Sequence, residues 1–198
     1  AGFPVVDEGA ELLVPSRATT TSYGVPIEGY RTMSGPIPDA AEACFEHDVI
    51  GDAGGEVPVA VVNRRLGIGV YQVFNRAQLP FHTVWRMLGE DTYGVAMEPS
   101  TNRDAGRWDA RERGELRELA PGETRTYDLE IGALRGADEI DQFAKRVASL
   151  GAAIFLTRVP LGHVRADLLV AISIEMPLPM PRSVICSPSH IMNMVPLV

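Results

Sequence analysis

The stretch of sequence that decides the fold is Leu79-Pro80-Phe81-His82-Thr83-Val84-Trp85-Arg86-Met87-Leu88. Successive side chains of an extended strand point to opposite faces. One face would carry Phe81, Thr83, Trp85 and Met87, and the other His82, Val84, Arg86 and Leu88. Both faces include apolar side chains. This alternation predicts a β-strand.

Similar short stretches recur on both sides of this one, separated by Gly, Pro, Asn and Asp residues typical of turns. They cover residues 11–14, 42–48, 57–63, 67–75 and 93–98. Strand follows strand without a helix between them, which favours an antiparallel sandwich over an α/β fold. The sequence therefore predicts an all-β protein.

The last predicted strand follows a tight-turn signal at residues 120–123, Ala-Pro-Gly-Glu. In residues 126–133, the side chains of Tyr127, Leu129, Ile131 and Ala133 alternate with mostly polar ones. We expect this apolar face to pack on the core and the other face to meet water.

One amphipathic helix is predicted after this strand, because the spacing of apolar residues changes. Ile140, Phe143, Val147 and Leu150 recur at helical intervals behind two acidic residues. Gly151 follows as the expected end of the helix.

Composition and charge narrow the possible classes of protein. The chain has 198 residues, of which 45% are hydrophobic and 22% charged, which excludes a disordered or collagen-like protein. The net charge of -8 opposes nucleic-acid binding. The longest apolar run, residues 168–174, is too short to cross a membrane. Two cysteines make no disulfide framework, so we expect a cytoplasmic protein without cofactor or metal.

Two regions of different character are expected, residues 1–153 and residues 154–198. The second region is rich in proline and methionine and carries three arginines against Asp167 and Glu175, so its charge is +1 and that of the first region is -9. Pro177, Pro179 and Pro181 alternate with apolar residues, a spacing that opposes both helix and central strand. We expect residues 154–198 to be a poorly packed tail.

Glu98 is the best candidate for chemistry, because it ends a predicted strand just before a proline-containing loop. Partial burial there would raise the pKa of the carboxyl group toward neutrality, while the loop leaves it open to substrate. Spacing alone favours a structural Glu whose carboxylate makes a hydrogen bond in a turn.

Four segments together resemble the galactose mutarotase-like, or aldose 1-epimerase-like, superfamily, in particular a poorly characterised bacterial branch of it. They are residues 2–10, residues 42–48, Trp85-Arg86 with residues 93–102, and residues 119–123 with the strand that follows. The resemblance covers about residues 1–150 and implies the C-terminal portion of a β-supersandwich with a sugar-binding cleft, followed by a tail that does not belong to the family.

The resemblance also implies roles for individual residues. A family Glu takes the proton from the anomeric hydroxyl while a His protonates the ring oxygen, and Glu98 matches the position of this base. Asn102 and Arg86 become candidate contacts to the sugar. Trp85 could offer an apolar face to a sugar ring, although a buried core Trp is the favoured interpretation.

The general acid departs from the family pattern. The motif that carries it precedes the Gly-Phe-Pro segment and would fall before Ala1, so we expect this chain to lack it and to have little or no activity by itself. His47 and His82 are poor replacements, since such histidines more often serve structure. His163 and His190 lie in the predicted tail.

Other kinds of site fit the sequence less well. Residues 46–48, Glu-His-Asp, would place the His on the opposite strand face from the two carboxylates, which opposes a compact metal site. Residues 67–69 lack the third glycine of a dinucleotide loop. Residues 103–115 alternate arginine with acidic side chains, typical of a solvated loop.

The leading hypothesis is therefore a carbohydrate isomerase that interconverts sugar anomers, with Glu98 as base and a small sugar as partner. The alternative is a β-sandwich that binds carbohydrate without catalysis. A sandwich with a purely structural role is a third possibility. The oligomeric state and the identity of the sugar are left open by the sequence.

Overall fold

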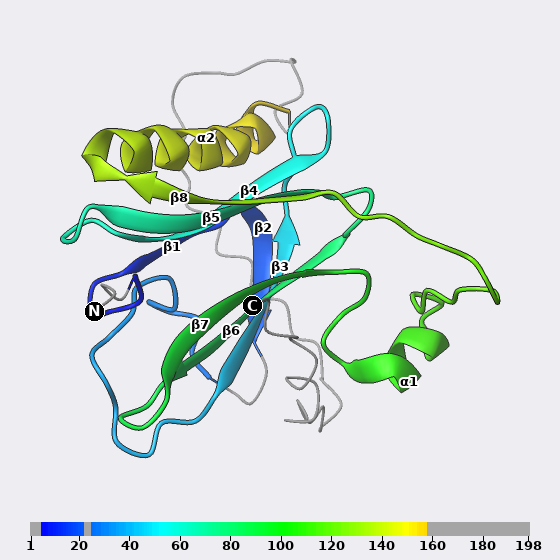
Figure 1. Ribbon diagram of the computed structural model, residues 1–198, viewed down its shortest axis with the longest axis horizontal. Coiled ribbons are helices and arrows are strands. Elements are labelled where there is room, and N and C mark those ends of the chain that lie inside the picture. Colours follow the sequence, from blue (N-terminus) through cyan, green and yellow to red (C-terminus); the bar gives the residue numbers. More distant parts are fainter. Residues whose placement is uncertain (1–4, 22–24, 158–198) are drawn as a thin grey trace, which may run out of the picture.

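The computed structural model describes residues 5–21 and 25–157, which form two four-stranded antiparallel sheets and two helices (Figure 1). Sheet A has the strand order β1-β4-β5-β8, and sheet B the order β2-β3-β6-β7. The predicted antiparallel β-sandwich is confirmed. The elements are β1 Glu11–Leu13, β2 Ser16–Thr21, β3 Ala43–Val49, β4 Glu56–Asn63, β5 Ile68–Asn75, β6 Phe81–Leu88, β7 Tyr93–Ser100, α1 Gly106–Glu112, β8 Leu129–Arg135 and α2 Gly136–Thr157.

Each sheet contains one long hairpin. In sheet A, β4 pairs with β5 from Glu56↔Asn75 to Asn63↔Ile68. Its turn uses Gly67 at a φ of 63°, a backbone conformation that glycine adopts readily. In sheet B, β6 pairs with β7 from Phe81↔Ser100 to Leu88↔Tyr93. Each of these four predicted strands therefore pairs with the strand next to it in sequence.

The main core lies between the inner faces of the two sheets. Sheet A contributes alternate residues of β4, among them Val57, Val59 and Val61, all nearly inaccessible to water. Sheet B contributes Phe45 and Val84 from β3 and β6. The alternation that predicted β6 is confirmed: His82, Val84 and Leu88 are buried on one face of the strand.

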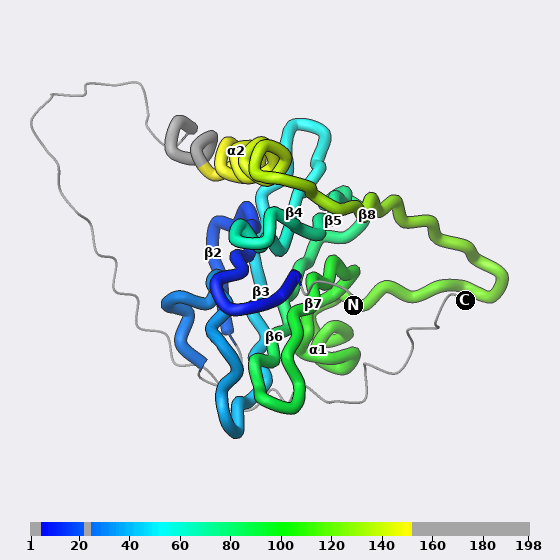
Figure 2. The backbone as a smooth tube through the Cα atoms, turned by 60° about the vertical axis from the view of Figure 1, so that its left-hand side comes forward, coloured from blue at the N-terminus to red at the C-terminus, as the bar shows by residue number. Residues whose placement is uncertain are grey.

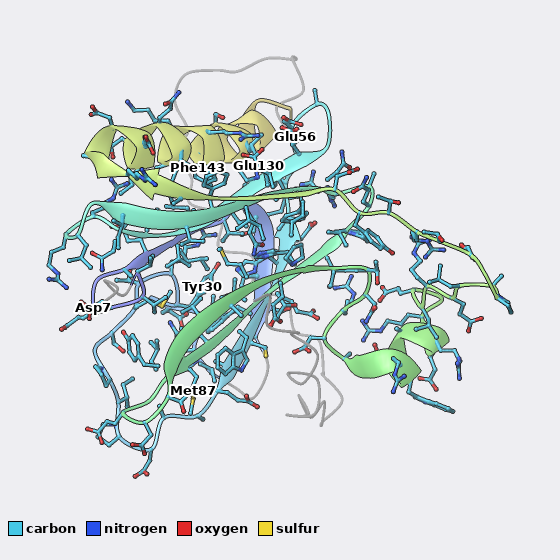
Figure 3. All side chains as sticks on the ribbon, in the orientation of Figure 1. Asp7, Tyr30, Glu56, Met87, Glu130 and Phe143 are labelled. Carbon is cyan, nitrogen blue, oxygen red and sulfur yellow. The ribbon has the colours of Figure 1, made fainter. Side chains whose placement is uncertain are left out.

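Helix α2 covers the outer face of sheet A (Figures 1 and 3). Its apolar stripe, Ile140, Phe143 and Val147, packs with Ala60, Val62 and Leu134. The helix begins at Gly136, and Glu139 accepts a hydrogen bond from the Arg135 backbone N–H at 2.8 Å. The predicted helix is thus confirmed, but its predicted end is wrong: α2 continues through Gly151 to Thr157. A glycine inside a helix costs only about 1 kcal/mol relative to alanine, so it does not force the helix to end.

Strand β8 is confirmed, but the predicted burial of its apolar face is wrong. Tyr127, Leu129 and Ile131 are 39%, 43% and 63% exposed, and Ala133 is exposed as well. Leu134, on the opposite face, is the buried residue of the strand, because it packs under α2. Alternation identified the strand correctly but could not show whether another layer covers each face.

Two elements were not predicted. Residues 103–115, expected to be a loop, contain the short helix α1, whose Ala110 is buried. Strand β2 pairs with β3 with a register shift between Ser16 and Thr19. Helix α1 has seven residues, too few for a clear helical period, and β2, with the sequence Ser-Arg-Ala-Thr-Thr-Thr, has too few apolar residues to show alternation.

The expected boundary at residue 153 falls inside α2. Residues 158–198 lie outside the described part of the chain, so the predicted tail stays a prediction. Within the described residues, no helix is long and apolar enough to span a membrane.

Candidate functional site

Glu98 lies on β7 directly opposite Thr83 of β6. Its neighbour Met97 packs toward the main core, so strand alternation points Glu98 to the outer face of sheet B. The residue is exposed. Desolvation of the carboxyl group, followed by repulsion from nearby Asp104, raises its pKa. The carboxylate is therefore accessible and more basic than an ordinary surface Glu.

Trp85 shares this outer face with Glu98. It stands opposite Ala96, so it is the diagonal cross-strand neighbour of Glu98. The ring is half-buried and lies over β7, where an added Cβ at Gly94 would be 3.7 Å from it. The indole Nε1 donates a hydrogen bond to the Glu42 carboxylate at 3.0 Å. Trp85 is thus a fixed aromatic surface beside Glu98 rather than part of the core between the sheets.

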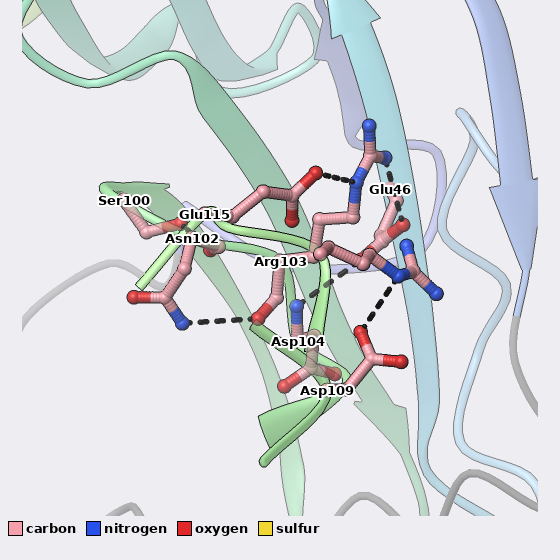
Figure 4. Close-up of polar contacts among 8 residues, drawn as sticks. Glu46, Ser100, Asn102, Arg103, Asp104, Asp109 and Glu115 are labelled. Atoms are coloured by element: carbon pink, nitrogen blue, oxygen red, sulfur yellow. Dashed lines mark hydrogen bonds and ion pairs between the residues drawn. The ribbon is translucent and has the colours of Figure 1, made fainter. Parts of the chain in front are cut away.

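The segment that follows β7 folds back over the same face and is held by charged groups (Figure 4). Arg103 makes ion pairs with Glu46 and Glu115 at 3.7 and 3.3 Å, and its guanidinium carbon lies 4.8 Å from the centre of the Phe81 ring. The Asp104 backbone N–H donates to Glu46 at 3.1 Å. These contacts form a polar wall beside the beginning of β6 and the end of β7.

Asn102 belongs to this wall, and its amide is engaged locally. Its Nδ2 donates to the Arg103 carbonyl at 3.2 Å, and its Oδ1 accepts from the Thr101 hydroxyl at 3.2 Å. Ser100 donates to the Asn102 carbonyl at 2.6 Å (Figure 4). The side chain is half-buried, so a ligand could compete for it only by replacing these bonds.

Arg86 is not brought together with Glu98. Alternation along β6 places it on the inner face of sheet B, opposite Val95. Its guanidinium donates to the Tyr30 carbonyl at 2.8 Å and lies over the Phe45 ring at 5.0 Å from the ring centre. The structure thus gives Arg86 a role in packing, and its contact with a substrate stays a prediction.

The two histidines of the described residues are also on the inner face. His47 and His82 stand opposite each other on β3 and β6, with ring centres 5.4 Å apart, and they are 5% and 1% exposed. His47 Nε2 lies 3.0 Å from the Tyr30 hydroxyl. His82 stacks on Phe74 of the other sheet. The sheet itself separates both rings from Glu98.

Burial keeps these histidines neutral. Desolvation, with the positive charge of Arg31 as the second cause, lowers the pKa of His47 to about 4. Desolvation and the neighbouring His47 lower the pKa of His82 to about 3. Both histidine rings are therefore buried on the face of sheet B opposite to Glu98.

Sequence reasoning missed several residues around Glu98, namely Glu42, Glu46, Arg103 and Glu115. For Glu46 the sequence did contain a signal. Alternation along β3 puts Glu46 on the opposite face from His47, which is the outer face of sheet B that carries Glu98. The contacts of Arg103 join segments far apart in sequence, so no local pattern could reveal them.

The sequence matches one known protein family. Residues 1–133 match the family described as "Domain of unknown function (DUF4432)". The chain belongs to this family. No curated protein matches the sequence.

This DUF4432 chain also resembles a solved structure, described as a putative aldose 1-epimerase from Klebsiella pneumoniae. The TM-score is 0.69 and the sequence identity 23%. The match covers 76% of this chain but 40% of that one, so the chain spans less than half of the length of the solved structure. The expected resemblance to an aldose 1-epimerase-like fold is confirmed for the fold alone.

Proposed function

We propose that the outer face of sheet B binds a sugar and that Glu98 acts there as the general base in the interconversion of its anomers. One observation carries the proposal: an accessible carboxylate of raised pKa lies beside a fixed Trp ring on the same sheet face. A sugar offers an apolar ring face to Trp85 and hydroxyl groups to Glu98. The likeness to an aldose 1-epimerase fold supports this reaction class.

The reaction needs one base and one acid. Glu98 takes the proton of the anomeric hydroxyl while the electron pair of that O–H bond forms the C1 carbonyl. The bond between C1 and the ring oxygen breaks, and the ring oxygen takes a proton from an acid. Rotation about C1–C2 and closure in the reverse sense give the other anomer. A higher pKa makes Glu98 a stronger base for the first step.

The described residues supply the base but no histidine acid on this face, since His47 and His82 lie on the other side of the sheet. We therefore expect slow anomer exchange by this chain alone. A small weak acid in solution, such as imidazolium, should restore the missing proton transfer if the substrate is seated at Glu98.

This expectation gives a direct test. The exchange between the α and β anomers of D-galactose and D-glucose is followed by NMR, with the protein-free rate in the same buffer subtracted. The wild-type excess rate should rise with imidazolium concentration, and Glu98→Gln should abolish that rise. Glu90→Gln serves as the matched control, because Glu90 is an exposed carboxylate in the turn between β6 and β7. An equal acid-dependent rate in wild type and Glu98→Gln would remove Glu98 from the mechanism.

A second function is favoured by the same absence of a histidine on the outer face of the described residues. The chain would then bind carbohydrate without converting it. Sugar binding without any protein-dependent exchange, at every imidazolium concentration, would select this function over catalysis.

A further inference from the structure

Three residues form a row across the outer face of sheet B. Glu46 of β3 pairs with Thr83 of β6, which pairs in turn with Glu98 of β7. The two glutamates therefore flank Thr83, each about 5 Å from it between Cα atoms. Thr83 is 4% exposed, and its hydroxyl has no hydrogen-bond partner among the described residues. Alternation along β6 directs this side chain toward the side of the sheet that carries both carboxylates.

Aromatic side chains stand on both sides of this row. Trp85 and Phe81 are the next residues of β6 on the outer face, one at each side of Thr83. The Arg103 guanidinium covers the Phe81 ring, with its carbon 4.8 Å from the ring centre. The Trp85 ring is half-buried and is held by the hydrogen bond from its Nε1 to Glu42. A sugar would therefore place the apolar face of its ring on Trp85 and turn its polar groups toward the row.

Negative charge predominates around this row. Four carboxylates belong to β3, β7 and the residue before β3: Glu42, Glu46, Asp48 and Glu98. Two arginines outside residues 103–115 pair with this set, Arg17 and Arg76, both with Asp48, at 3.8 and 3.2 Å. Residues 103–115, which contain α1 and lie beside β7 (Figure 2), add four arginines and four acidic side chains. The outer face of sheet B together with this segment therefore has a net charge of -2.

Glu98 is the carboxylate of this set that a ligand can reach without breaking a contact. Its side chain makes no hydrogen bond or ion pair with a described residue, whereas Glu46 is held by Arg103 at 3.7 Å. Arg103 is in turn shared with Glu115 at 3.3 Å, so it is not free to bind an anion. Repulsion from Asp104, the second cause of the raised pKa of Glu98, shows that more negative charge lies close by. A positively charged ligand group would offset this repulsion, and a negative one would add to it.

We propose that this face selects a sugar with a free amino group on the carbon next to the anomeric centre, an ammonium at neutral pH, over neutral and anionic sugars. The inference rests on the proposed function, because it takes Glu98 as the residue at the anomeric hydroxyl. The two oxygens of the Glu98 carboxylate accept hydrogen bonds from both neighbouring groups, the hydroxyl and the ammonium. The unpartnered hydroxyl of Thr83 accepts another N–H of the ammonium. A phosphate or carboxylate on the sugar would instead meet Glu46 and Glu98 as like charges.

Sugars of different charge test this selectivity. Affinities for D-galactosamine, D-galactose and D-galactose 6-phosphate are measured at low salt by Trp85 fluorescence of the full chain carrying Trp108→Phe. D-Galactosamine should bind about two- to fivefold more tightly than D-galactose, and the phosphate at least about twofold more weakly. Both differences should shrink at high salt, because they arise from charge. N-Acetyl-D-galactosamine is the matched control: its nitrogen is at the same position but uncharged, so it should bind no more tightly than D-galactose.

Two substitutions locate the charge that selects. Glu46→Gln removes a carboxylate from the row and releases Arg103, so the preference for D-galactosamine over D-galactose 6-phosphate should fall at least about threefold. Glu90→Gln removes the same charge from the turn between β6 and β7 and should leave this preference unchanged.

The outcomes separate this inference from the proposed function. Equal affinities for D-galactosamine and D-galactose would overturn the inference alone. Tighter binding of the phosphate, with Arg103 or Arg107 as its partner, would do the same, as would equal effects of the two substitutions. No binding of any of these sugars would overturn the proposed function and the inference with it.

Discussion

Acidification should destabilise the protein through the buried pair His47 and His82. The pKa values of both rings are lowered in the folded state, from 6.5 to about 4 and about 3. The unfolded chain therefore binds protons below pH 6.5 while the folded protein does not. Full stability is present above pH 6.5 and is lost as the pH falls toward the folded-state values.

The size of the loss follows from these values. Each histidine contributes about 1.4 kcal/mol per pH unit below 6.5, so at about pH 5 each lowers the free energy of unfolding by about 2 kcal/mol. The two together lower it by about 4 kcal/mol, a large part of the 5 to 15 kcal/mol typical of a domain. His82→Phe removes one titrating ring but keeps an aromatic group against Phe74. The loss in this variant should be about half.

Urea unfolding at a series of pH values between about 7.5 and 5 measures both losses. Glu98 acts in the opposite direction, because its raised pKa makes the folded protein bind a proton first. The difference between wild type and His82→Phe cancels that contribution. Equal losses of stability on acidification in the two proteins would refute the assignment of acid sensitivity to this pair.

Two substitutions test the packing. Phe45→Ala should lower the free energy of unfolding by about 3 to 5 kcal/mol, because Phe45 is fully buried and stacks on Tyr30 at 4.7 Å between ring centres. Trp108→Ala is the control: Trp108 is 72% exposed, so this substitution should change the free energy of unfolding by less than about 0.5 kcal/mol. Comparable losses in urea unfolding would contradict the position of the core. Gly132→Ala should lower the free energy of unfolding by about 1 to 3 kcal/mol, because the added methyl group would contact the Tyr71 ring. In a Tyr71→Ala background the same substitution should cost much less. Additive effects in this double-mutant cycle would show that the ring does not cover Gly132.

The strands of the two long hairpins could be predicted because the side chains on their two faces differ in polarity and burial. Alternation along β6 separates His82 and Val84 from Trp85, and the same rule applied to β7 separates Met97 from Glu98. The outer-face position of the proposed base therefore follows from sequence alone. The opposite orientation of Arg86 followed from the same rule, although its role was carried over from a family resemblance.

The burial of a strand face and the contacts between distant segments could not be predicted, because both depend on which other part of the chain packs there. The apolar alternation at Leu129 and Ile131 is a pattern typical of a core, yet these side chains are exposed, because burial requires a facing layer that no local pattern describes. The contacts of Arg103 with Glu46 depend in the same way on a chain reversal after β7. Helix α1 is too short for its periodicity to be distinguished from a charged loop.

A sugar titration monitored by Trp85 fluorescence tests the central claim, a sugar site on the outer face of sheet B, most directly. The chain has two tryptophans, so Trp108→Phe leaves Trp85 as the single reporter. We predict a saturable change in emission with D-galactose or D-glucose, weakened by Glu98→Gln and unaffected by Glu90→Gln. No change with either sugar, or a change that Glu98→Gln leaves intact, would contradict the claim.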